Sequence, residues 1–252
     1  MQLVQNAKHQ NPPLASADGG EAIILAGGLG TRLRTVVNDL PKCMAPVAGK
    51  PFLHYVIQHL LQQGVHQFIF SLGYLSEPIE AFLSANYPLL KYQLSIEGEP
   101  LGTGGAIQLA AKKATEKNVL VLNGDTLFAA DINQLLNMHI NQQAACTLCL
   151  KPMKNFDRYG VVGLNDNNTV LSFKEKQFYT EGYINGGVYA LNVEQFLREG
   201  LPEKFSFEKD YLEKKVTENK LSGIVQDKYF IDIGIPEDYE RAQREFANLK
   251  MA

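Results

Sequence analysis

Residues 22–33 read Ala-Ile-Ile-Leu-Ala-Gly-Gly-Leu-Gly-Thr-Arg-Leu. The apolar run at 22–26 has strand length and no amphipathic period, which predicts a buried parallel strand. Gly27, Gly28 and Gly30 then occupy the passage from strand to loop, where glycine permits positive φ and lets a ligand touch the main chain. Because amide groups in such a turn can point inward and hold phosphate oxygens, the stretch predicts a phosphate-binding loop after a buried strand.

Two cations accompany this loop. Arg32 carries a permanent charge on a planar donor fork that suits phosphate, and Lys42, in the pair Pro41-Lys42, adds a compact charge. By themselves these residues also fit a glycine-rich turn with two solvated cations. Arg32 and Leu33 follow where the dehydrogenase fingerprint G-x-G-x-x-G requires its third glycine. The stretch therefore argues against a nicotinamide enzyme.

Composition limits the class of protein. The chain has 252 residues, enough for one large domain or two small ones with a substantial core. A net charge of −3, without a long Lys/Arg run, argues against a nucleic-acid partner. The apolar runs are far shorter than the roughly 20 residues of a membrane span, and no secretory signal precedes the cysteines. We therefore expect a cytoplasmic protein with no membrane or nucleic-acid partner, and we leave a homo-oligomer open.

The order of strands and helices predicts an α/β fold. Residues 1–20 lack a periodic apolar face, so we expect a mobile arm there and a single domain over 21–252. Strands alternating with helices predict a doubly wound, mostly parallel Rossmann-like sheet in a first half of about 21–140, and short strands predict a smaller β-rich lobe in the remainder, about 141–252. The expected strands are 22–26, 68–72, 92–96, 118–126, 146–152, 160–164, 169–176, 187–191 and 229–232, and the expected helices are 51–63, 78–85, 106–113 and one from Pro236.

Two pairs of residues could indicate a metal or redox site. In both pairs, the spacing within the predicted strand or helix argues against it. Cys146 and Cys149 have C-x-x-C spacing, but on a strand over 144–150 they would face opposite sides, so we expect core thiols. His54 and His59 are five apart in one predicted helix and do not share a helix face. We expect ordinary helix histidines.

Acidic residues follow the predicted strands. In open α/β sheets ligands bind beyond the carboxyl ends of the strands, where Asp125 and the loop around Glu99 fall. Asp232 is flanked by apolar residues in Tyr-Phe-Ile-Asp-Ile-Gly, and an unpaired buried carboxylate there would be costly, which predicts a partner or a metal ion. A lone Asp after Asn-Gly is also a common turn former.

Taken in order, these motifs resemble those of the sugar-1-phosphate nucleotidyltransferases over about residues 21–245: L-A-G-G-x-G-T-R-L, P-K, G-D and a late D-I-G. That family joins a nucleoside triphosphate to a sugar 1-phosphate, giving a nucleotide sugar and pyrophosphate. The resemblance implies a magnesium ion, Mg²⁺, held by Asp125 and Asp232, and catalysis by Arg32, Lys42, Asp125 and Lys176. The nucleotide contacts that it implies are Leu25, Ala26, Gly27, Gly28, Gly30, Thr31, Glu99, Gly102 and Thr103. The sugar contacts that it implies are Gly124, Gly160, Glu175, Lys176, Asn185 and Gly186.

Two positions depart from the family pattern. Phe173-Lys-Glu-Lys-Gln177 matches the E-K-P motif at Glu175 and Lys176, but Gln177 stands where proline is usual. An exposed strand of mixed charge is the alternative for this segment. Cys43 follows Lys42 where proline or glutamine is commoner, which affects the rigidity of the loop and leaves Lys42 in place.

The segment 99–105, Glu-Pro-Leu-Gly-Thr-Gly-Gly, resembles the family's base-recognition loop. A carboxylate accepts two parallel hydrogen bonds, which matches N1–H and N2–H₂ of guanine, whereas an amide suits uracil. Glu99 therefore favours GTP, with Glu97 as an alternative partner for the base, although uridylyl relatives have similar loops.

Residues 35–47 and 99–106 most resemble family members that use D-glycero-α-D-manno-heptose 1-phosphate in the synthesis of cell-surface polysaccharides such as lipopolysaccharide, capsule or S-layer glycans. Mannose 1-phosphate with GTP, and N-acetylmuramic acid 1-phosphate with UTP, are the alternatives. A relative without catalysis, which binds nucleotide sugars and regulates a partner enzyme, is the alternative of another class.

Overall fold

The computed structural model describes residues 20–28, 40–73 and 75–247 of the chain. The predicted N-terminal arm, except Gly20, and the predicted site residues Gly30, Thr31 and Arg32 lie outside the described residues. The other predicted site residues fall within the described ranges.

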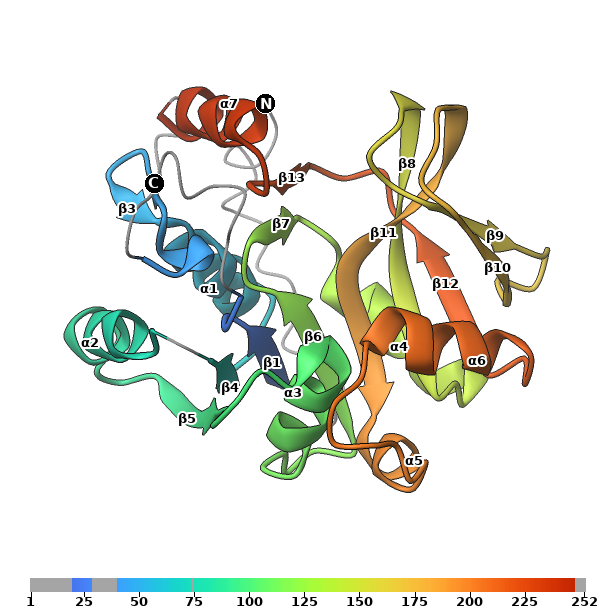
Figure 1. Ribbon diagram of the computed structural model, residues 1–252, viewed down its shortest axis with the longest axis horizontal. Helices are drawn as coiled ribbons and strands as arrows, with labels where there is room; N and C mark the ends of the chain where they lie inside the picture. The colour runs from blue at the N-terminus through green and yellow to red at the C-terminus, as the bar shows by residue number, and fades with distance from the viewer. Residues whose placement is uncertain (1–19, 29–39, 74, 248–252) are drawn as a thin grey trace.

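A seven-stranded sheet forms the centre, in the order β12-β8-β11-β6-β1-β4-β5 (Figure 1). β11 is antiparallel to β6 and β8, and every other neighbouring pair is parallel. This confirms the predicted α/β class with a mostly parallel sheet. The strands are β1 Glu21–Leu25, β4 Gln67–Leu72, β5 Lys91–Ile96, β6 Asn118–Asn123, β8 Cys146–Phe156, β11 Tyr179–Asn192 and β12 Leu221–Val225.

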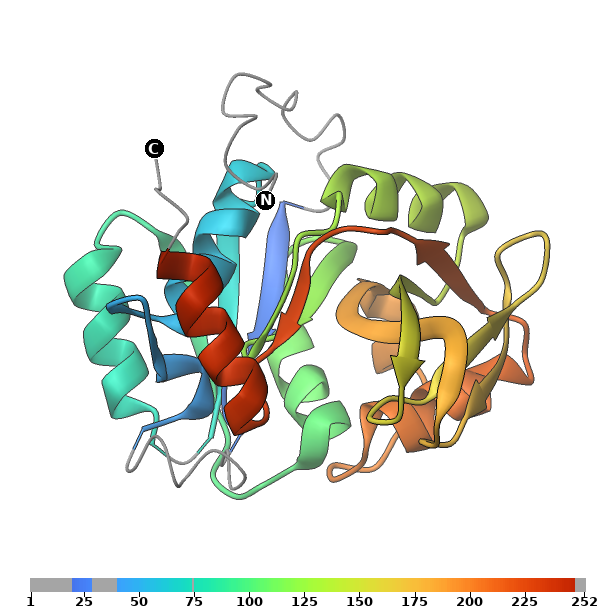
Figure 2. The ribbon, with the colours of Figure 1, turned by 90° about the horizontal axis from the view of Figure 1, so that it is seen from above.

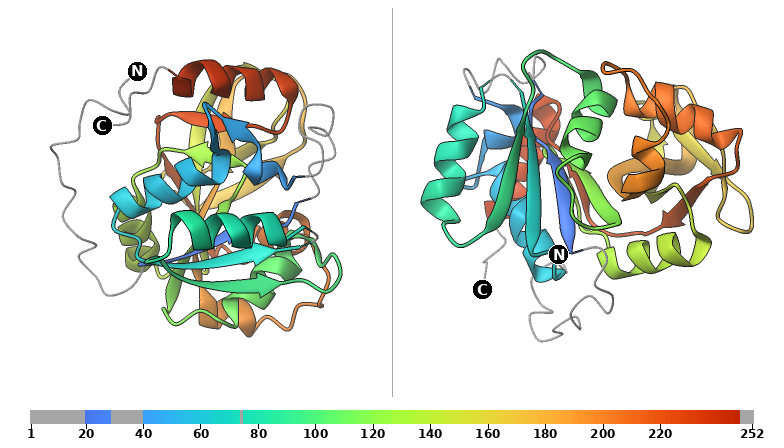
Figure 3. Two further views of the ribbon diagram at one scale, coloured as in Figure 1. Left: turned by 90° about the vertical axis from the view of Figure 1, so that its left-hand side faces the viewer. Right: turned by 90° about the horizontal axis from the view of Figure 1, so that it is seen from below.

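Helices cover both faces of the sheet (Figure 3). Successive side chains of β1 point to opposite faces, so Ile23 joins one apolar cluster and Ile24 the other. The Ile24 face packs against α1 Phe52–Gln62, α2 Glu77–Asn86, α4 Ile132–Gln142 and α7 Pro236–Ala247. The Ile23 face packs against α3 Gly102–Ala111, α5 Val193–Leu197, the π-helical turn η3 Phe207–Leu212 and Val216 of α6 Glu213–Val216.

Three short antiparallel pairs complete the fold, and one of them positions the site. β7 Thr126–Phe128 pairs with β13 Phe230–Asp232, so that Asp232 lies opposite Thr126. Figure 2 shows the segment with β13, in dark red, crossing from the part that carries β8 and β11 towards α7. The other pairs are β9 Val161–Leu164 with β10 Val170–Lys174 and β2 Pro46–Val47 with β3 Lys50–Pro51, which follows the 3₁₀ turn η2 Lys42–Met44.

The predicted start of one helix is wrong. The sequence places it at Ala106, but α3 begins at Gly102. The reason is packing, because a Cβ on Gly104 would lie 2.1 Å from the Phe205 ring and one on Gly105 would lie 2.2 Å from the Glu203 carbonyl oxygen. Glycine is therefore required by close contact with the segment 203–205, and the helix continues through it.

Two strand boundaries also differ from the predictions. β10 ends at Lys174 and leaves Glu175 and Lys176 in the following loop. β11 begins at Tyr179 instead of Gly187, because its polar first half gains its pairing from β8. The cysteine prediction is confirmed: Cys146 and Cys149 are free, buried and in opposite clusters.

Within the described residues, no helix combines the length and apolar character needed to cross a membrane.

A buried histidine, His139 of α4, ties the helix to the sheet. Its Nδ1 lies 2.9 Å from the Thr147 hydroxyl and its Nε2 lies 3.2 Å from Asn118 Oδ1. Burial lowers the pKa of His139 from 6.5 to about 4, and burial likewise lowers the pKa of His59 to about 4. Both side chains are therefore neutral in the folded protein near pH 6, whereas the unfolded chain protonates them.

The free energy of unfolding should therefore fall as pH drops from 6.5 towards 4, by up to about 3 kcal/mol for each of the two histidines. His139→Gln should lower stability at pH 7 but make the acid-induced loss smaller. Urea unfolding at pH 7, 5.5 and 4.5 measures this, with His66→Gln at an exposed position as the control. An unchanged pH slope in His139→Gln would contradict the prediction.

Candidate active site

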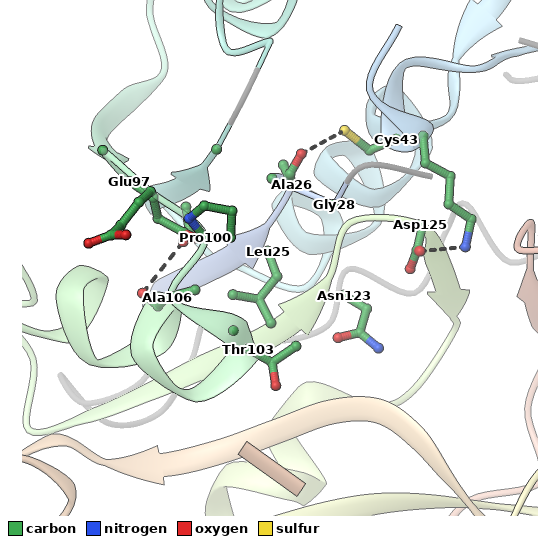
Figure 4. A pocket seen from close by; sticks show the side chains of 17 residues that line it. Leu25, Ala26, Gly28, Cys43, Glu97, Pro100, Thr103, Ala106, Asn123 and Asp125 are labelled. Carbon is green, nitrogen blue, oxygen red and sulfur yellow. Dashed lines mark hydrogen bonds and ion pairs between the residues drawn. The ribbon is translucent and has the colours of Figure 1, made fainter. Parts of the chain in front are cut away.

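A cavity of about 820 Å³ opens at the carboxyl ends of β1, β4, β5 and β6. Figure 4 shows Glu97 and Pro100 at one end of it and Asp125 at the other. The strands end here because all four run in the same direction, so their following loops meet at one edge. The predicted site residues that line the cavity are Leu25, Ala26, Gly27, Gly28, Lys42, Glu99, Gly102, Thr103 and Asp125.

Glycines keep one wall of the cavity close to the bare main chain. A Cβ on Gly27 would lie 2.5 Å from the Gly73 nitrogen, so the ends of β1 and β4 can approach only without side chains there. At Gly28 a Cβ would meet no atom of the described residues within 4 Å. The wall can therefore take a ligand against its backbone, as the sequence predicts for a phosphate-binding loop.

Lys42, Asp125 and Asp232 form a charged centre. The Lys42 ammonium Nζ lies 2.5 Å from Asp125 Oδ2 and 3.4 Å from Asp232 Oδ1. Figure 4 shows the contact with Asp125. The two carboxylates, far apart in the sequence, thus converge on one cationic atom. All three side chains are largely buried, with 15%, 33% and 22% exposed.

Backbone pairing holds the two aspartates in place. The amide of Ile233 donates to the main-chain oxygen of Asp125 at 3.1 Å, next to the β7–β13 pairing. The Gly234 amide donates to Asp232 Oδ1 at 2.8 Å, and the Tyr159 hydroxyl donates to Oδ2 at 3.4 Å. The orientation of the Asp232 carboxylate is therefore set by groups on both of its oxygens.

In the loop after β5, the two glutamates predicted as partners for the base have different contacts. Glu97 Oε2 accepts a hydrogen bond from the Leu101 amide at 2.9 Å, which closes the loop onto the start of α3. The Glu99 side chain is exposed and makes no hydrogen bond or ion pair within the described residues. Thr103 lines the cavity while its hydroxyl accepts from the Phe207 amide at 3.0 Å.

The predicted sugar contacts fall in three places: the β11 bulge, the loop after β10, and Gly124 beside β1. Asn185 and Gly186 lie in a bulge of β11, where Asn185 Nδ2 donates to the Tyr189 hydroxyl at 2.8 Å and to Glu208 at 3.2 Å. The bulge packs against Asn123, a residue that lines the cavity, since a Cβ on neighbouring Gly187 would lie 2.6 Å from its Nδ2.

The second place is the loop after β10. Glu175 and Lys176 are exposed there and do not line the cavity, and Gly160 packs against the Lys174 oxygen. Gly124 lies beside β1, with its amide donating to the Leu25 oxygen at 2.8 Å. The roles of these residues stay predictions.

Cys43 lines the cavity but is a poor nucleophile. Its side chain is buried, and burial, with a contribution from Asp125, raises the pKa of the thiol to about 12. Its Sγ donates to the Ala26 oxygen at 3.7 Å. We interpret it as a packing residue behind Lys42.

Sequence reasoning missed several residues that shape the site. Ser71 and Gly73 lie at the end of β4 and just after it, so the carboxyl-end rule could have identified them. Asn123 immediately precedes Gly124 and could have been found in the same way. Arg158 and Tyr159 carry no pattern that indicates contact with Asp232.

The fold and this site define a nucleotidyl transferase: residues 21–248 match the Nucleotidyl transferase family, and the chain belongs to it. It is 54% identical over 225 residues to D-glycero-alpha-D-manno-heptose 1-phosphate guanylyltransferase of Aneurinibacillus thermoaerophilus, covering 89% of this chain and 97% of that relative. The protein of the same name from Campylobacter jejuni is 44% identical, with 87% and 96% covered. The crystal structure of HddC from Yersinia pseudotuberculosis complexed with GMP-PN superposes with a TM-score of 0.80 at 37% identity, covering 90% of this chain and 99% of that one.

Gly234 gives a test of the charged centre. A Cβ there would lie 2.8 Å from Asp232 Oδ1 and 2.9 Å from Lys42 Nζ. Gly234→Ala should therefore displace both groups and lower nucleotidyl transfer about 10- to 100-fold, as changes next to functional carboxylates do. Melting temperature should change by a few degrees at most.

The matched control is Gly223→Ala in β12, where the new Cβ is crowded to 2.8 Å by Leu150 and Leu164 instead. It should cost stability without loss of transfer. A wild-type rate in Gly234→Ala would show that the geometry around Asp232 is unimportant.

Proposed function

We propose that this protein transfers GMP from GTP to D-glycero-α-D-manno-heptose 1-phosphate, giving GDP-heptose and pyrophosphate. The observation that carries the proposal is the convergence of Asp125 and Asp232 on one cationic position beside a nucleotide-sized cavity. The names of the relatives with 54% and 44% identity support guanine and heptose as the particular substrates.

The chemistry needs positioning and charge neutralisation. An oxygen of the sugar 1-phosphate attacks the α-phosphorus of GTP in line, and pyrophosphate leaves. Because the attacking phosphate is already anionic, no side-chain nucleophile is required, and the inert Cys43 is consistent with that. Arg32 and Lys42 would hold the triphosphate and Lys176 the acceptor phosphate, lowering the barrier through orientation and charge.

The residues of the charged centre fit Mg²⁺. The position of Lys42 Nζ, 2.5 Å from Asp125 Oδ2 and 3.4 Å from Asp232 Oδ1, supports a shared cation position between the two carboxylates. The described residues contain no group of three or more His, Cys, Asp or Glu that could hold a metal ion. Two carboxylates suit Mg²⁺, which completes its shell with water and substrate oxygens. When bound, Mg²⁺ would neutralise charge on the phosphates.

For the base, the loop after β5 supports Glu99. Glu97 is already used by the Leu101 amide, whereas the Glu99 carboxylate beside the cavity is available. A carboxylate can accept from both N1–H and N2–H₂ of guanine. With UTP it would face carbonyl oxygens, and a mismatched polar site is costly.

For the acceptor, we propose that the second half of the domain, about 141–252, supplies the sugar contacts. Asn185 and Gly186 lie in the β11 bulge, next to Gly187, which packs against the cavity-lining Asn123, and this placement supports contacts to ring hydroxyls. Gly124, Gly160 and Glu175 would complete the sugar subsite. Mannose 1-phosphate shares the manno-configured ring hydroxyls and is therefore the strongest rival acceptor.

The product would supply the cytoplasmic stage of cell-surface glycan synthesis, such as lipopolysaccharide, capsule or S-layer. The alternative of another class, a regulatory protein that binds nucleotide sugar without catalysis, need not retain the predicted catalytic residues. All four are present in the sequence: Arg32, Lys42, Asp125 and Lys176.

The test is a matrix of GTP, UTP, dTTP and ATP against heptose, mannose, glucose and N-acetylmuramic acid 1-phosphates, read as pyrophosphate release. GTP with manno-heptose 1-phosphate should give the highest kcat/KM, and the value for GTP should exceed those for UTP, dTTP and ATP by at least about a hundredfold. Asp125→Asn, as the internal control, should lose orders of magnitude in turnover with its melting temperature retained.

A higher kcat/KM with UTP than with GTP would overturn the guanine assignment. A higher kcat/KM with mannose 1-phosphate than with heptose 1-phosphate would overturn the heptose assignment. Binding without pyrophosphate release across the whole matrix would favour the regulatory protein.

A further inference from the structure

Charged side chains of alternating sign run from the outer surface of α7 to the cavity. Each member pairs with the next within 4 Å, so every carboxylate in the series has a cation on each side except the last. They come from α7, the loop after β8, β13, η2 and the loop after β6 (Figures 1 and 2). In order, the series is Arg241, Asp238, Arg158, Asp232, Lys42 and Asp125.

Asp232 occupies the middle of this series, and its two oxygens have different neighbours. Oδ1 faces the cavity side, 3.4 Å from Lys42 Nζ and 2.8 Å from the Gly234 amide. Oδ2 faces the other side, 3.4 Å from the Tyr159 hydroxyl and 3.9 Å from Arg158 Nη2. Rotation of the carboxylate would break contacts on both sides, so the outer groups determine which oxygen faces the cavity.

Arg158 is itself held firmly. Its Nη1 donates to Asp238 Oδ2, and Asp238 lies in the first turn of α7, where a carboxylate interacts well with the helix dipole. The guanidinium also lies over the Tyr159 ring, 5.4 Å from its centroid. A planar donor fork fixed by these two contacts is suited to orienting a neighbouring carboxylate.

Direct contact with substrate is a poorer explanation for the position of Arg158 than a role in orienting Asp232. Arg158 does not line the cavity, and its guanidinium points to the two carboxylates Asp232 and Asp238. A solvated surface pair also fits poorly, because the Asp238 side chain is only 16% exposed and that of Arg158 35%. Exposed ion pairs contribute little to stability, but a partly buried guanidinium beside a functional carboxylate can orient that carboxylate.

We propose that Arg158 is a positioning residue: anchored by Asp238, it holds the Asp232 carboxylate with Oδ1 turned to the cation position between Asp232 and Asp125, which Lys42 Nζ occupies in the described structure. This inference rests on the proposed function, in which Asp232 is a Mg²⁺ ligand. Arg158 thereby connects α7 and the loop after β8 to the metal-binding carboxylates.

The experiment measures Mn²⁺ affinity directly, by electron paramagnetic resonance of free Mn²⁺, in wild type, Arg158→Met, Arg158→Lys and Asp238→Asn. Arg158→Met should weaken Mn²⁺ binding about tenfold, in the range of other changes to groups that orient metal ligands. Arg158→Lys keeps the charge without the planar fork, so its Mn²⁺ affinity should lie between those of wild type and Arg158→Met. Asp238→Asn should weaken binding in the same direction although it does not touch Asp232.

Kinetics separate positioning from a structural role. In Arg158→Met the Mg²⁺ concentration for half-maximal rate should rise, while kcat at saturating Mg²⁺ and GTP affinity without metal change less than about threefold. The control is Arg198→Met, which removes an exposed ion pair with Glu194 and should leave every reading unchanged.

Wild-type Mn²⁺ affinity in Arg158→Met, or an effect confined to the KM for the sugar 1-phosphate, would overturn the inference. If Arg158→Met proves unstable, Arg158→Lys and Asp238→Asn decide, because each retains a hydrogen-bonding side chain. The variant Asp232→Asn distinguishes a failure of the metal assignment from a failure of the positioning role of Arg158. If it binds Mn²⁺ as wild type does, the metal assignment itself fails; if it loses Mn²⁺ while the Arg158 and Asp238 variants do not, only the positioning role fails.

Discussion

Two carboxylates placed side by side repel each other unless a cation lies between them, and the structure is organised around that constraint at Asp125 and Asp232. Lys42 Nζ supplies the cation in the described structure, at 2.5 and 3.4 Å. On the proposed function, the same position would suit Mg²⁺, because a cation there would offset the repulsion between the two carboxylates. In the function proposed above, Lys42 would then contact the phosphates when substrate and metal are bound.

The fold brings these groups together from distant parts of the chain. Parallel strands deliver the glycine wall, the Glu99 loop and Asp125 to one edge of the sheet. Asp232 cannot arrive in this way, since it belongs to a late strand outside the main sheet. The antiparallel pairing of β13 with β7 places it there, and α7 follows directly with the Asp238 that supports Arg158. The segment from β13 through α7 is thus part of the site as well as of the core.

Much of this could be predicted from the sequence, and the limits have physical causes. The run 22–26 and the strand before Asp125 are apolar and local, so β1, β6 and the edge that carries the cavity follow from pattern alone. The start of α3 could not be predicted, because its glycines are explained by contact with Phe205 about a hundred residues away. The pairing of Asp232 with Thr126 and the contact of Arg158 with Asp232 also join residues far apart in sequence and leave no local pattern. Only the resemblance to a family connected Asp125 with Asp232.

The central claim is that Asp125 and Asp232 share one divalent cation, which takes the place of Lys42 Nζ between them. The most direct measurement is a crystal structure of the protein with Mn²⁺ and a non-hydrolysable GTP analogue, read from the anomalous signal of manganese. The account predicts a manganese peak bounded by Asp125 and Asp232, with Lys42 Nζ moved to the phosphates. Manganese bound away from both carboxylates, with Lys42 still between them and the nucleotide in the cavity, would contradict it.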